Sequence, residues 1–548
     1  MKNALLILAI GFFSTVTFAA PKDTLTIGVA AEFESLNPLI ANQAAARYLM
    51  YTAYRPMVIL SPDLKWEPKL IKTIPTLKNK LAKRNGQGLD LTLEFTDDVW
   101  GDGTPITCAD LEFSWQVGKS KNTSVPAREP YENITSVKWD KANPKKCSLT
   151  YAKATYDYFT TFPDLVPAHI ERAVFDKFKD QPEGYDKNSN YTKNPTMPGL
   201  WHGPYMVSEV KLGSHVILVP NPKFAGKKPF FKQVIFKLVP SNATLEANLR
   251  SGSIDMITPA AGLGVDQADD FDKKVKAEKL PYEVRFEDGL VYAHIDLNLE
   301  NPILADVRVR KALSLAANKK EIVTSLMGGR GKEALHFVTD KDPWYTDKIT
   351  TYKFNRREAN KLLDEAGWKM GANGFREKDG KPLSLTLIAA AGAKINETIE
   401  VFLQSQFKTI GVELLVKNEP ARVFFGETTN HRKFQMALFS WVSTPESNPR
   451  PILHSTSIPT EKNSWAGQNY TGYKNAEVDK LIESLEQELD APKRAALAKK
   501  IIEFYTSEVP VIPIYFRQMN SVVPKGIKGY RLSGNTNGET LFIENWSM

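Results

Sequence analysis

Short β-rich runs alternate with helical patterns along most of the chain, and this alternation constrains the fold most strongly. Residues 89–95 (LDLTLEF) alternate apolar and polar side chains strictly, which is typical of a half-buried strand. Residues 383–388 also have a strand pattern, and residues 397–408 have the spacing of a helix that ends near Gly411. Strands interleaved with helices in this way favour an α/β fold with layered, partly parallel sheets.

The length of the chain predicts more than one domain, because 548 residues exceed what a single hydrophobic core usually serves. Residues 61–88 contain three prolines and a lysine-rich stretch, which indicates a change of organisation. Residues 180–204 are rich in Pro, Gly, Asn and Tyr and form the strongest candidate linker in the first half. No apolar run beyond the N-terminus approaches the roughly 20 residues that span a bilayer, so we expect a soluble mature protein.

The N-terminus has the pattern of a secretory signal peptide. Lys2 precedes an apolar run at residues 4–13, and Thr17 and Ala19 occupy the −3 and −1 positions for cleavage before Ala20. We therefore predict a signal peptide at residues 1–19 and a periplasmic protein, with a buried N-terminal helix as the alternative. No Cys follows the apolar run, so we do not expect a lipoprotein.

Charge and cysteine content narrow the function further. The formal net charge of +8 is spread along the chain without a basic block, so no nucleic-acid partner is expected. After export, Cys108 and Cys147 can oxidise, and either a disulfide or two separately buried thiols fits the sequence. Two Cys with no nearby His do not make a zinc site.

The motifs that usually carry catalysis are missing. The chain has no G-x-S-x-G, Walker, H-E-x-x-H or strand-linked G-x-G-x-x-G pattern, and its seven His lack metal-ligand spacing. Asp97, Asp98 and Asp102 lack the distal Glu of a calcium loop, which favours a solvated turn. We therefore predict no enzyme activity, cofactor or metal site, with an exported hydrolase as the alternative from another functional class.

Several stretches resemble, in order, the extracellular solute-binding proteins of family 5, which are oligopeptide- and dipeptide-binding receptors of bacterial ABC importers. The matching residues are 91–95 with 100–107 and 109–111, 203–205 with 221–224, 249–255, Asn298 with 306–313, 365–368, 410–412, and 472–473 with 477–479. Each stretch is short, but their common order extends across the whole chain.

This resemblance implies a two-lobed periplasmic-binding-protein fold of the class II type, with three domains and a ligand cleft at the hinge. The lobes would close on the ligand by hinge motion. The implied division is 20–60 for the first part of lobe I, 61–189 for an inserted small domain, 190–290 for the second part of lobe I, 291–509 for lobe II, and 510–548 for the third part of lobe I.

The resemblance also implies the function. We expect a monomeric periplasmic receptor that captures peptides or peptide-like solutes and delivers them to the permease of an ABC transporter for transmembrane transport. A second hypothesis keeps the fold but changes the ligand to a cell-wall fragment, an opine or sugar, or a metal chelate.

Trp441 matches a cleft tryptophan of the peptide-binding members. Those members often carry an Asp three residues later, which pairs with the peptide's α-ammonium, but Thr444 stands there in this chain. The basic residue that some members carry three positions before the tryptophan is replaced by Leu438. Glu446 is a nearby carboxylate that could take the role of the missing Asp. Both departures argue against a standard free-ended peptide.

Asp296 aligns with an acidic cleft position, and alternation places it on one strand face with His294 and Asn298. A hinge hydrogen bond is the alternative role for Asp296. The remaining candidates for ligand contact, with core or surface packing as the alternative for the last three, are Glu32, Phe33, Tyr131, Tyr515 and Arg517.

Overall fold

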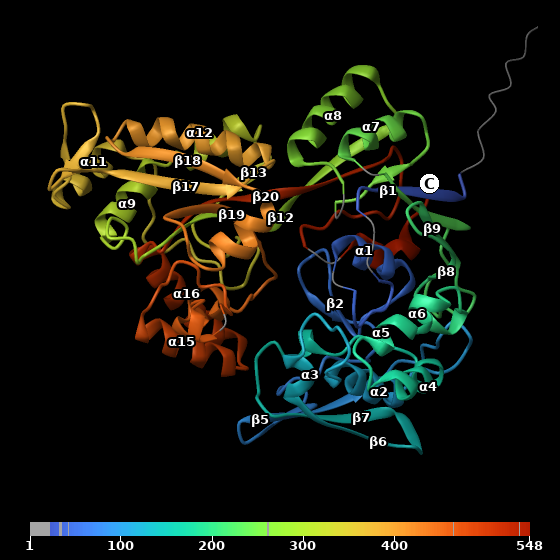
Figure 1. Ribbon diagram of the computed structural model, residues 1–548. Coiled ribbons are helices and arrows are strands. Elements are labelled where there is room, and N and C mark those ends of the chain that lie inside the picture. Colours follow the sequence, from blue (N-terminus) through green and yellow to red (C-terminus); the bar gives the residue numbers. More distant parts are fainter. Residues whose placement is uncertain are drawn as a thin grey trace, which may run out of the picture.

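The computed structural model describes residues 22–31, 35–41, 43–239, 241–259, 262–463, 465–535 and 538–548. Two bodies of helices and strands lie side by side and are joined by two long strands (Figure 1). The predicted signal peptide and the candidates Glu32 and Phe33 fall outside the described residues. In the described ranges, no helix is both long and apolar enough to cross a membrane.

One large mixed sheet extends through both bodies, which we call lobe I (right in Figure 1) and lobe II (left). Strand β1 pairs in parallel with β10 and β11, and β17 pairs in parallel with β18 and β19. The strands in spatial order are β18 (Glu413–Glu419), β17 (Ser384–Ala390), β19 (Met436–Val442), β12 (Tyr282–Leu297), β20 (Val511–Pro524), β11 (Met256–Ile257), β1 (Thr24–Val29), β10 (Gln233–Leu238), β9 (His215–Pro220) and β8 (Tyr205–Lys211), with β13 (Gly331–Glu333) paired to β20.

The two long strands, β12 and β20, connect the lobes. They run antiparallel from the Tyr282–Pro524 pair in lobe I to the Asp296–Val511 pair in lobe II. The register shifts after Asp288, where a Cβ on Gly289 would lie 2.5 Å from a carbonyl oxygen of β20. This close approach requires glycine, and the resulting bulge lies where the chain passes between the lobes.

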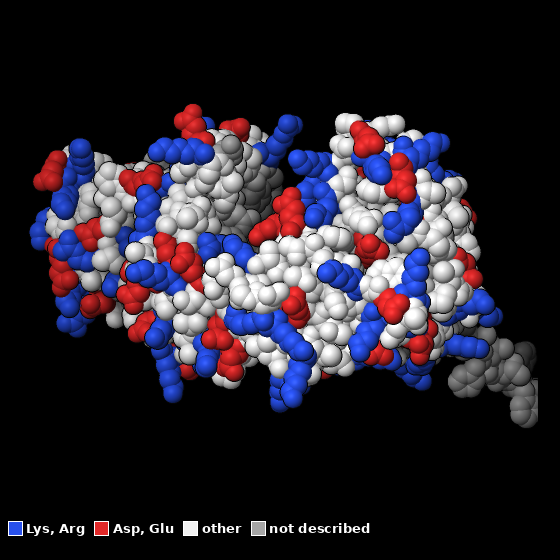
Figure 2. Space-filling model, turned by 90° about the horizontal axis from the view of Figure 1, so that it is seen from below, with Lys and Arg blue, Asp and Glu red and all other residues white. Residues whose placement is uncertain are grey.

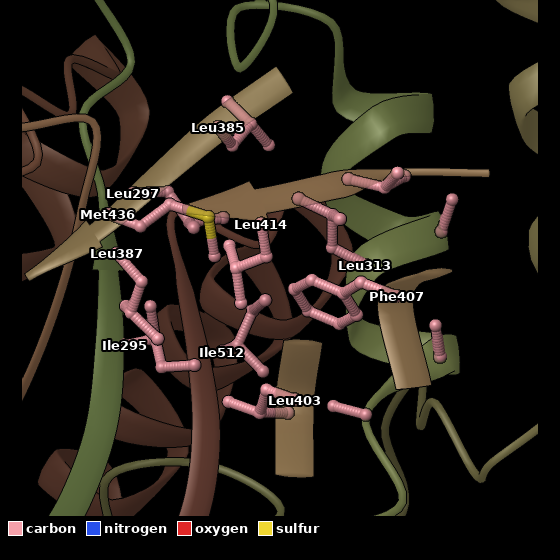
Figure 3. Close-up of a cluster of buried hydrophobic side chains, with 14 of the residues drawn as sticks. Ile295, Leu297, Leu313, Leu385, Leu387, Leu403, Phe407, Leu414, Met436 and Ile512 are labelled. Carbon is pink, nitrogen blue, oxygen red and sulfur yellow. The ribbon is translucent and has the colours of Figure 1, made fainter. Parts of the chain in front are cut away.

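Lobe II is built on a core of aliphatic and aromatic side chains between its part of the sheet and three helices. Ile295, Leu297, Leu387, Met436 and Ile512 pack together in this core (Figure 3). The covering helices are α9 (Val307–Ala316), α11 (Arg356–Glu365) and α12 (Lys394–Lys408).

The rest of lobe II consists of shorter elements and one helical pair, α15 (Ala476–Gln487) with α16 (Ala491–Glu508). This pair lies below the sheet in Figure 1. The shorter elements are α10 (Lys319–Glu321), η3 (Ile322–Leu326), β14 (Lys369–Met370), β15 (Arg376–Lys378), β16 (Lys381–Pro382), α13 (Ala421–Val423), η4 (Phe424–Thr429), α14 (Arg450–Leu453), η5 (Ser455–Ser457) and η6 (Glu461–Asn463).

A separate four-stranded sheet lies at the bottom of lobe I in Figure 1. Its antiparallel order is β4 (Ala82–Asn85), β5 (Gly88–Glu94), β7 (Asn143–Tyr151) and β6 (Ile134–Asp140). Helix α2 (Cys108–Lys119) packs on this sheet, and Thr107 and Asp110 form a capping box at its N-terminus. A disulfide joins Cys108 to Cys147 with their Cα atoms 5.9 Å apart, so it ties the start of the helix to β7.

The segment 180–204 is not a linker, and that prediction was wrong. It forms α5 (Gly184–Asn188), α6 (Asn190–Lys193) and η2 (Pro198–Leu200), and the side chains of Tyr185, Tyr191 and Trp201 are buried in the core of lobe I. The aromatic residues explain the difference, because each buries a large apolar area that a solvated linker would expose.

The remaining helices and strands of lobe I complete its surface. They are α1 (Ala44–Ala53), β2 (Val58–Leu60), β3 (Trp66–Pro68), α3 (Glu129–Asn133), η1 (Tyr158–Thr161), α4 (Ala168–Phe178), α7 (Asn242–Arg250), α8 (Val265–Glu278) and η7 (Glu539–Asn545).

Candidate ligand-binding cleft

The strand β12 presents two chemically different faces where it enters lobe II. Ile295 and Leu297 point into the apolar core, as Figure 3 shows. Because side chains alternate along a strand, Tyr292, His294 and Asp296 lie on the opposite face. The sheet therefore carries aromatic and polar groups on the face away from the core.

Four rings form a continuous wall on this face. Trp441 on β19 pairs with Tyr292 across the strands, and the His294 ring lies nearly parallel to both, at centroid distances of 6.2 Å and 5.0 Å. Tyr470 extends the wall, since its ring lies 6.0 Å from Trp441 at an interplanar angle of 23°. The sequence candidate Trp441 is thus part of an aromatic surface that offers contact area at a small cost in side-chain entropy.

A pocket of about 750 Å³ opens beside this wall, and we call it the Trp441 pocket. Most of its lining is apolar or uncharged, and among the described residues that line it, Asp342 is the one with an acidic or basic side chain. The lining residues are Tyr292, Phe337, Val338, Thr339, Asp342, Trp441, Val442, Ser443, Thr444, Ser447, Asn448, Pro449, Pro451, Ile452 and Gln468.

The carboxylate of Asp342 is held by two main-chain hydrogen bonds. The N–H of Trp344 donates to Oδ1 at 2.8 Å, and the N–H of Glu446 donates to Oδ2 at 2.7 Å. Burial raises the pKa of Asp342 to about 6, and the nearby charge of Glu446 acts in the same direction, although the two hydrogen bonds oppose them. Asp342 is not among the site residues predicted from the sequence.

Thr444 and Glu446 differ in their position relative to the Trp441 pocket. Thr444 lines the Trp441 pocket, and its main-chain N–H donates to the Ser447 hydroxyl at 2.8 Å. The carboxylate of Glu446 is instead 3.0 Å from the guanidinium of Arg494, and Glu446 does not line the pocket. Since Arg494 is itself buried, the structure places the charge of Glu446 in a structural ion pair.

His294, whose ring is part of the wall, forms a buried pair with Asp296. The His294 Nε2 and Asp296 Oδ1 atoms are 3.3 Å apart, and both residues are almost wholly buried. Neither lines the Trp441 pocket. Asn298, further along the same face, donates to the carbonyl oxygens of Arg432 and Phe434. Asp296 thus pairs with one ring of the wall, and Asn298 holds the segment that precedes β19.

The structure does not bring the other described candidates into this pocket. Tyr131 packs against Gly118 of α2 in lobe I, and Tyr515 belongs to the core of lobe II. Arg517 is exposed on β20 at the crossing between the lobes. Among the residues that the structure describes, no group of three or more His, Cys, Asp or Glu side chains is placed to hold a metal ion.

Two further hollows, of about 790 and 1,090 Å³, follow the crossing strands from the Trp441 pocket towards lobe I. The first shares Val338 and Thr339 with the Trp441 pocket, and the second includes residues from both lobes. Seen from below, the surface is hollowed between the two halves, and side chains of both charges border the hollow (Figure 2). The ion pairs at these hollows are Lys341–Glu287, Lys332–Asp288, Lys332–Asp340 and Arg531–Asp63.

The fold of solved solute-binding proteins matches this architecture over nearly the whole chain. An oligopeptide-binding protein from Thermus thermophilus, complexed with a pentapeptide, aligns with a TM-score of 0.71 at 23% identity, covering 96% of this chain and 97% of that one. NikZ from Campylobacter jejuni, in complex with Ni(L-His), aligns with a TM-score of 0.75 at 23% identity, covering 96% and 100%. The predicted α/β, two-lobed periplasmic-binding-protein fold is confirmed.

Sequence comparison identifies the family. The model of the bacterial extracellular solute-binding proteins, family 5 (middle), matches residues 77–464, and the chain belongs to this family. The oligopeptide-binding protein AppA of Bacillus subtilis (strain 168) is 26% identical over 436 residues, which cover 78% of this chain and 76% of that protein. The predicted class, an extracellular solute-binding protein, is confirmed.

Proposed function

We propose that the protein is an exported receptor that captures a peptide or peptide-like solute between its lobes and delivers it to the permease of an ABC importer. The observation that carries this proposal is the Trp441 pocket, which lies beside the ring wall and continues into the hollows between the lobes. The peptides named for the relatives AppA and the T. thermophilus protein support the ligand class.

A contact between the lobes supports closure as the mode of capture. Tyr156, which follows β7 of the small sheet, donates its hydroxyl hydrogen to the carbonyl oxygen of Glu446 at 2.6 Å. Its main-chain N–H donates to the carbonyl oxygen of Glu486 at 3.0 Å. Arg494 lies 4.8 Å from the centre of the Tyr156 ring. Lobe I thus touches the loop that also borders the pocket, so closure and occupancy would be coupled.

We also propose the domain boundaries, the route of export and the monomeric state of this receptor. The domain boundaries are those implied by the resemblance, with Gly289 in the bulge as a hinge position. The chain would reach the periplasm through a cleaved signal peptide at residues 1–19, carry no lipid anchor, act as a monomer and leave its ligand chemically unchanged. The predicted contacts of Trp441, Thr444 and Arg517 with the ligand remain part of the proposal.

A second candidate function keeps the receptor and changes the ligand to a non-peptide solute such as a metal chelate. Thr444 favours it, because a neutral hydroxyl provides no negative charge to balance an α-ammonium. The Ni(L-His) complex of NikZ shows that a protein of this fold holds such a solute.

Thermal-shift and calorimetric titration of the ligand-stripped protein tests the function. A pool of di- to pentapeptides should raise the melting temperature, since a ligand at 100 times its dissociation constant stabilises a protein by about 2.7 kcal/mol. Stabilisation only by metal chelates, sugars or cell-wall fragments would support the second candidate. Recovery of cleaved peptides would support the exported hydrolase.

A further inference from the structure

Among the described residues that line the Trp441 pocket, one is acidic and none is basic. In the described part of the chain, no Lys, Arg or His side chain forms an ion pair with Asp342, whose hydrogen bonds come only from main-chain N–H groups. The carboxylates around it differ in this respect. Glu446 pairs with Arg494, and Asp340, in the adjoining hollow, pairs with Lys332 at 2.6 Å.

A carboxylate in this position is costly for the empty protein, because burial disfavours its charged form. The same burial raises its pKa to about 6. An ionised carboxylate has about four lone-pair sites, and two main-chain hydrogen bonds leave further acceptor capacity. These two bonds also fix the direction of the group, so a cation in the pocket would meet a preorganised partner.

The neighbouring polar groups are already engaged. Thr444 and Ser447 satisfy each other, since the Ser447 hydroxyl donates to the Thr444 carbonyl oxygen at 2.7 Å and accepts from its N–H. The Asn448 side chain donates to Glu486 at 2.8 Å. Asp342 is therefore the lining group with both a negative charge and spare acceptor capacity.

The apolar part of the pocket lining indicates which chemical group the rest of the ligand carries. Phe337, Val338 and Ile452 give the pocket apolar surface near Trp441. On the basis of the proposed function, we propose that the Asp342 carboxylate binds an ammonium group of the ligand. The ligands would be solutes that carry an ammonium group next to an apolar group, such as peptides with a free amino terminus and an apolar first side chain. The charge that Thr444 lacks would then come from a different loop.

Calorimetry with two matched pools tests this inference. One pool holds tri- to pentapeptides that begin with Leu, Ile or Phe, and the other holds the same peptides with acetylated amino termini. The wild-type protein should bind the free pool roughly 10- to 100-fold more tightly, which corresponds to the worth of a hydrogen bond to a charged group. The Asp342→Asn variant should lose this preference by weakening only the free pool.

The control variant is Asp97→Asn, which removes an exposed carboxylate paired with Lys145 outside the pocket and its adjoining hollows and should keep the wild-type preference. Circular dichroism checks that each variant is folded, and the wild-type comparison of the two pools stands even if Asp342→Asn does not fold. Equal binding of both pools by the wild type, or an unchanged preference in folded Asp342→Asn, would overturn the inference while leaving peptide capture intact. Failure of both pools to bind would instead refute the proposed function, and this inference with it.

Discussion

The substitution Asp342→Asn should change the pH dependence of stability in the ligand-free protein. An Asp carboxyl group ordinarily has a pKa of 3.8, and burial in the folded protein raises the pKa of Asp342 to about 6. Between these two values the folded state binds a proton that the unfolded state does not. The wild-type protein therefore loses stability as the pH rises through this interval, and below and above it the contribution of Asp342 is constant.

The structure sets the size of the effect. A rise of about 2 pKa units corresponds to about 3 kcal/mol, at 1.36 kcal/mol per unit. Asn does not titrate, so the stability of Asp342→Asn relative to wild type should improve by up to about 3 kcal/mol between about pH 4 and pH 7.5. Asn also loses one acceptor for the N–H of Trp344 or Glu446, which costs about 1 to 3 kcal/mol. That cost is largely independent of pH. The pH-dependent part of the difference in unfolding free energy between the two proteins therefore reports the charge of Asp342.

Urea unfolding of both proteins at several pH values, after the bound ligand has been removed by unfolding and refolding, measures this difference. The transition of the lobe that holds Asp342 is the one to compare, because a protein of two lobes need not unfold in one step. A free-energy difference that stays constant within about 0.5 kcal/mol from pH 4 to pH 7.5 would refute the reasoning that burial destabilises the ionised Asp342.

Three other perturbations follow from the contacts in the structure. Trp441→Ala should weaken peptide binding by about 2 kcal/mol, or roughly 30-fold in calorimetry, because it removes the largest ring beside the pocket; a change below twofold would contradict its role. Replacing Cys108 and Cys147 together by Ser should lower the unfolding free energy by about 4 kcal/mol, since the disulfide closes a sequence separation of 39 residues; a loss below about 1 kcal/mol in urea would contradict the chain-entropy argument. Tyr156→Phe removes the hydrogen bond to Glu446 across the lobes and should speed ligand release about 2- to 10-fold in stopped-flow measurements, whereas an unchanged release rate would separate this contact from closure.

Much of the secondary structure could be predicted because its signals are local. The side chains of Thr107 and Asp306, which stand just before α2 and α9 in the sequence, cap these helices, and the alternation at 89–95 corresponds to β5. The start of β12 was less visible. The strand begins at Tyr282, but only its part from Val291 onward alternates clearly in the sequence, because the part before the bulge crosses between the lobes and lacks one consistently buried face.

The candidate site was harder to predict because its parts meet only in the folded chain. Trp441 could be found from its family match, but the partner of Asp342 is the N–H of Glu446, which lies 104 residues away in sequence. Likewise, nothing local in the sequence shows that Arg494 binds the carboxylate of Glu446. The one local signal for Asp342 is the Asp-Pro-Trp turn, in which its side chain accepts from the N–H two residues on.

The central claim is that two lobes hold a solute without changing it. Native mass spectrometry of the protein, purified without unfolding and then saturated with the peptide pool, tests this claim most directly. The account predicts a noncovalent complex from which acid releases a peptide of unchanged mass with a free amino terminus. A protein that stays ligand-free at saturating peptide, or that releases a peptide of altered mass, would contradict it.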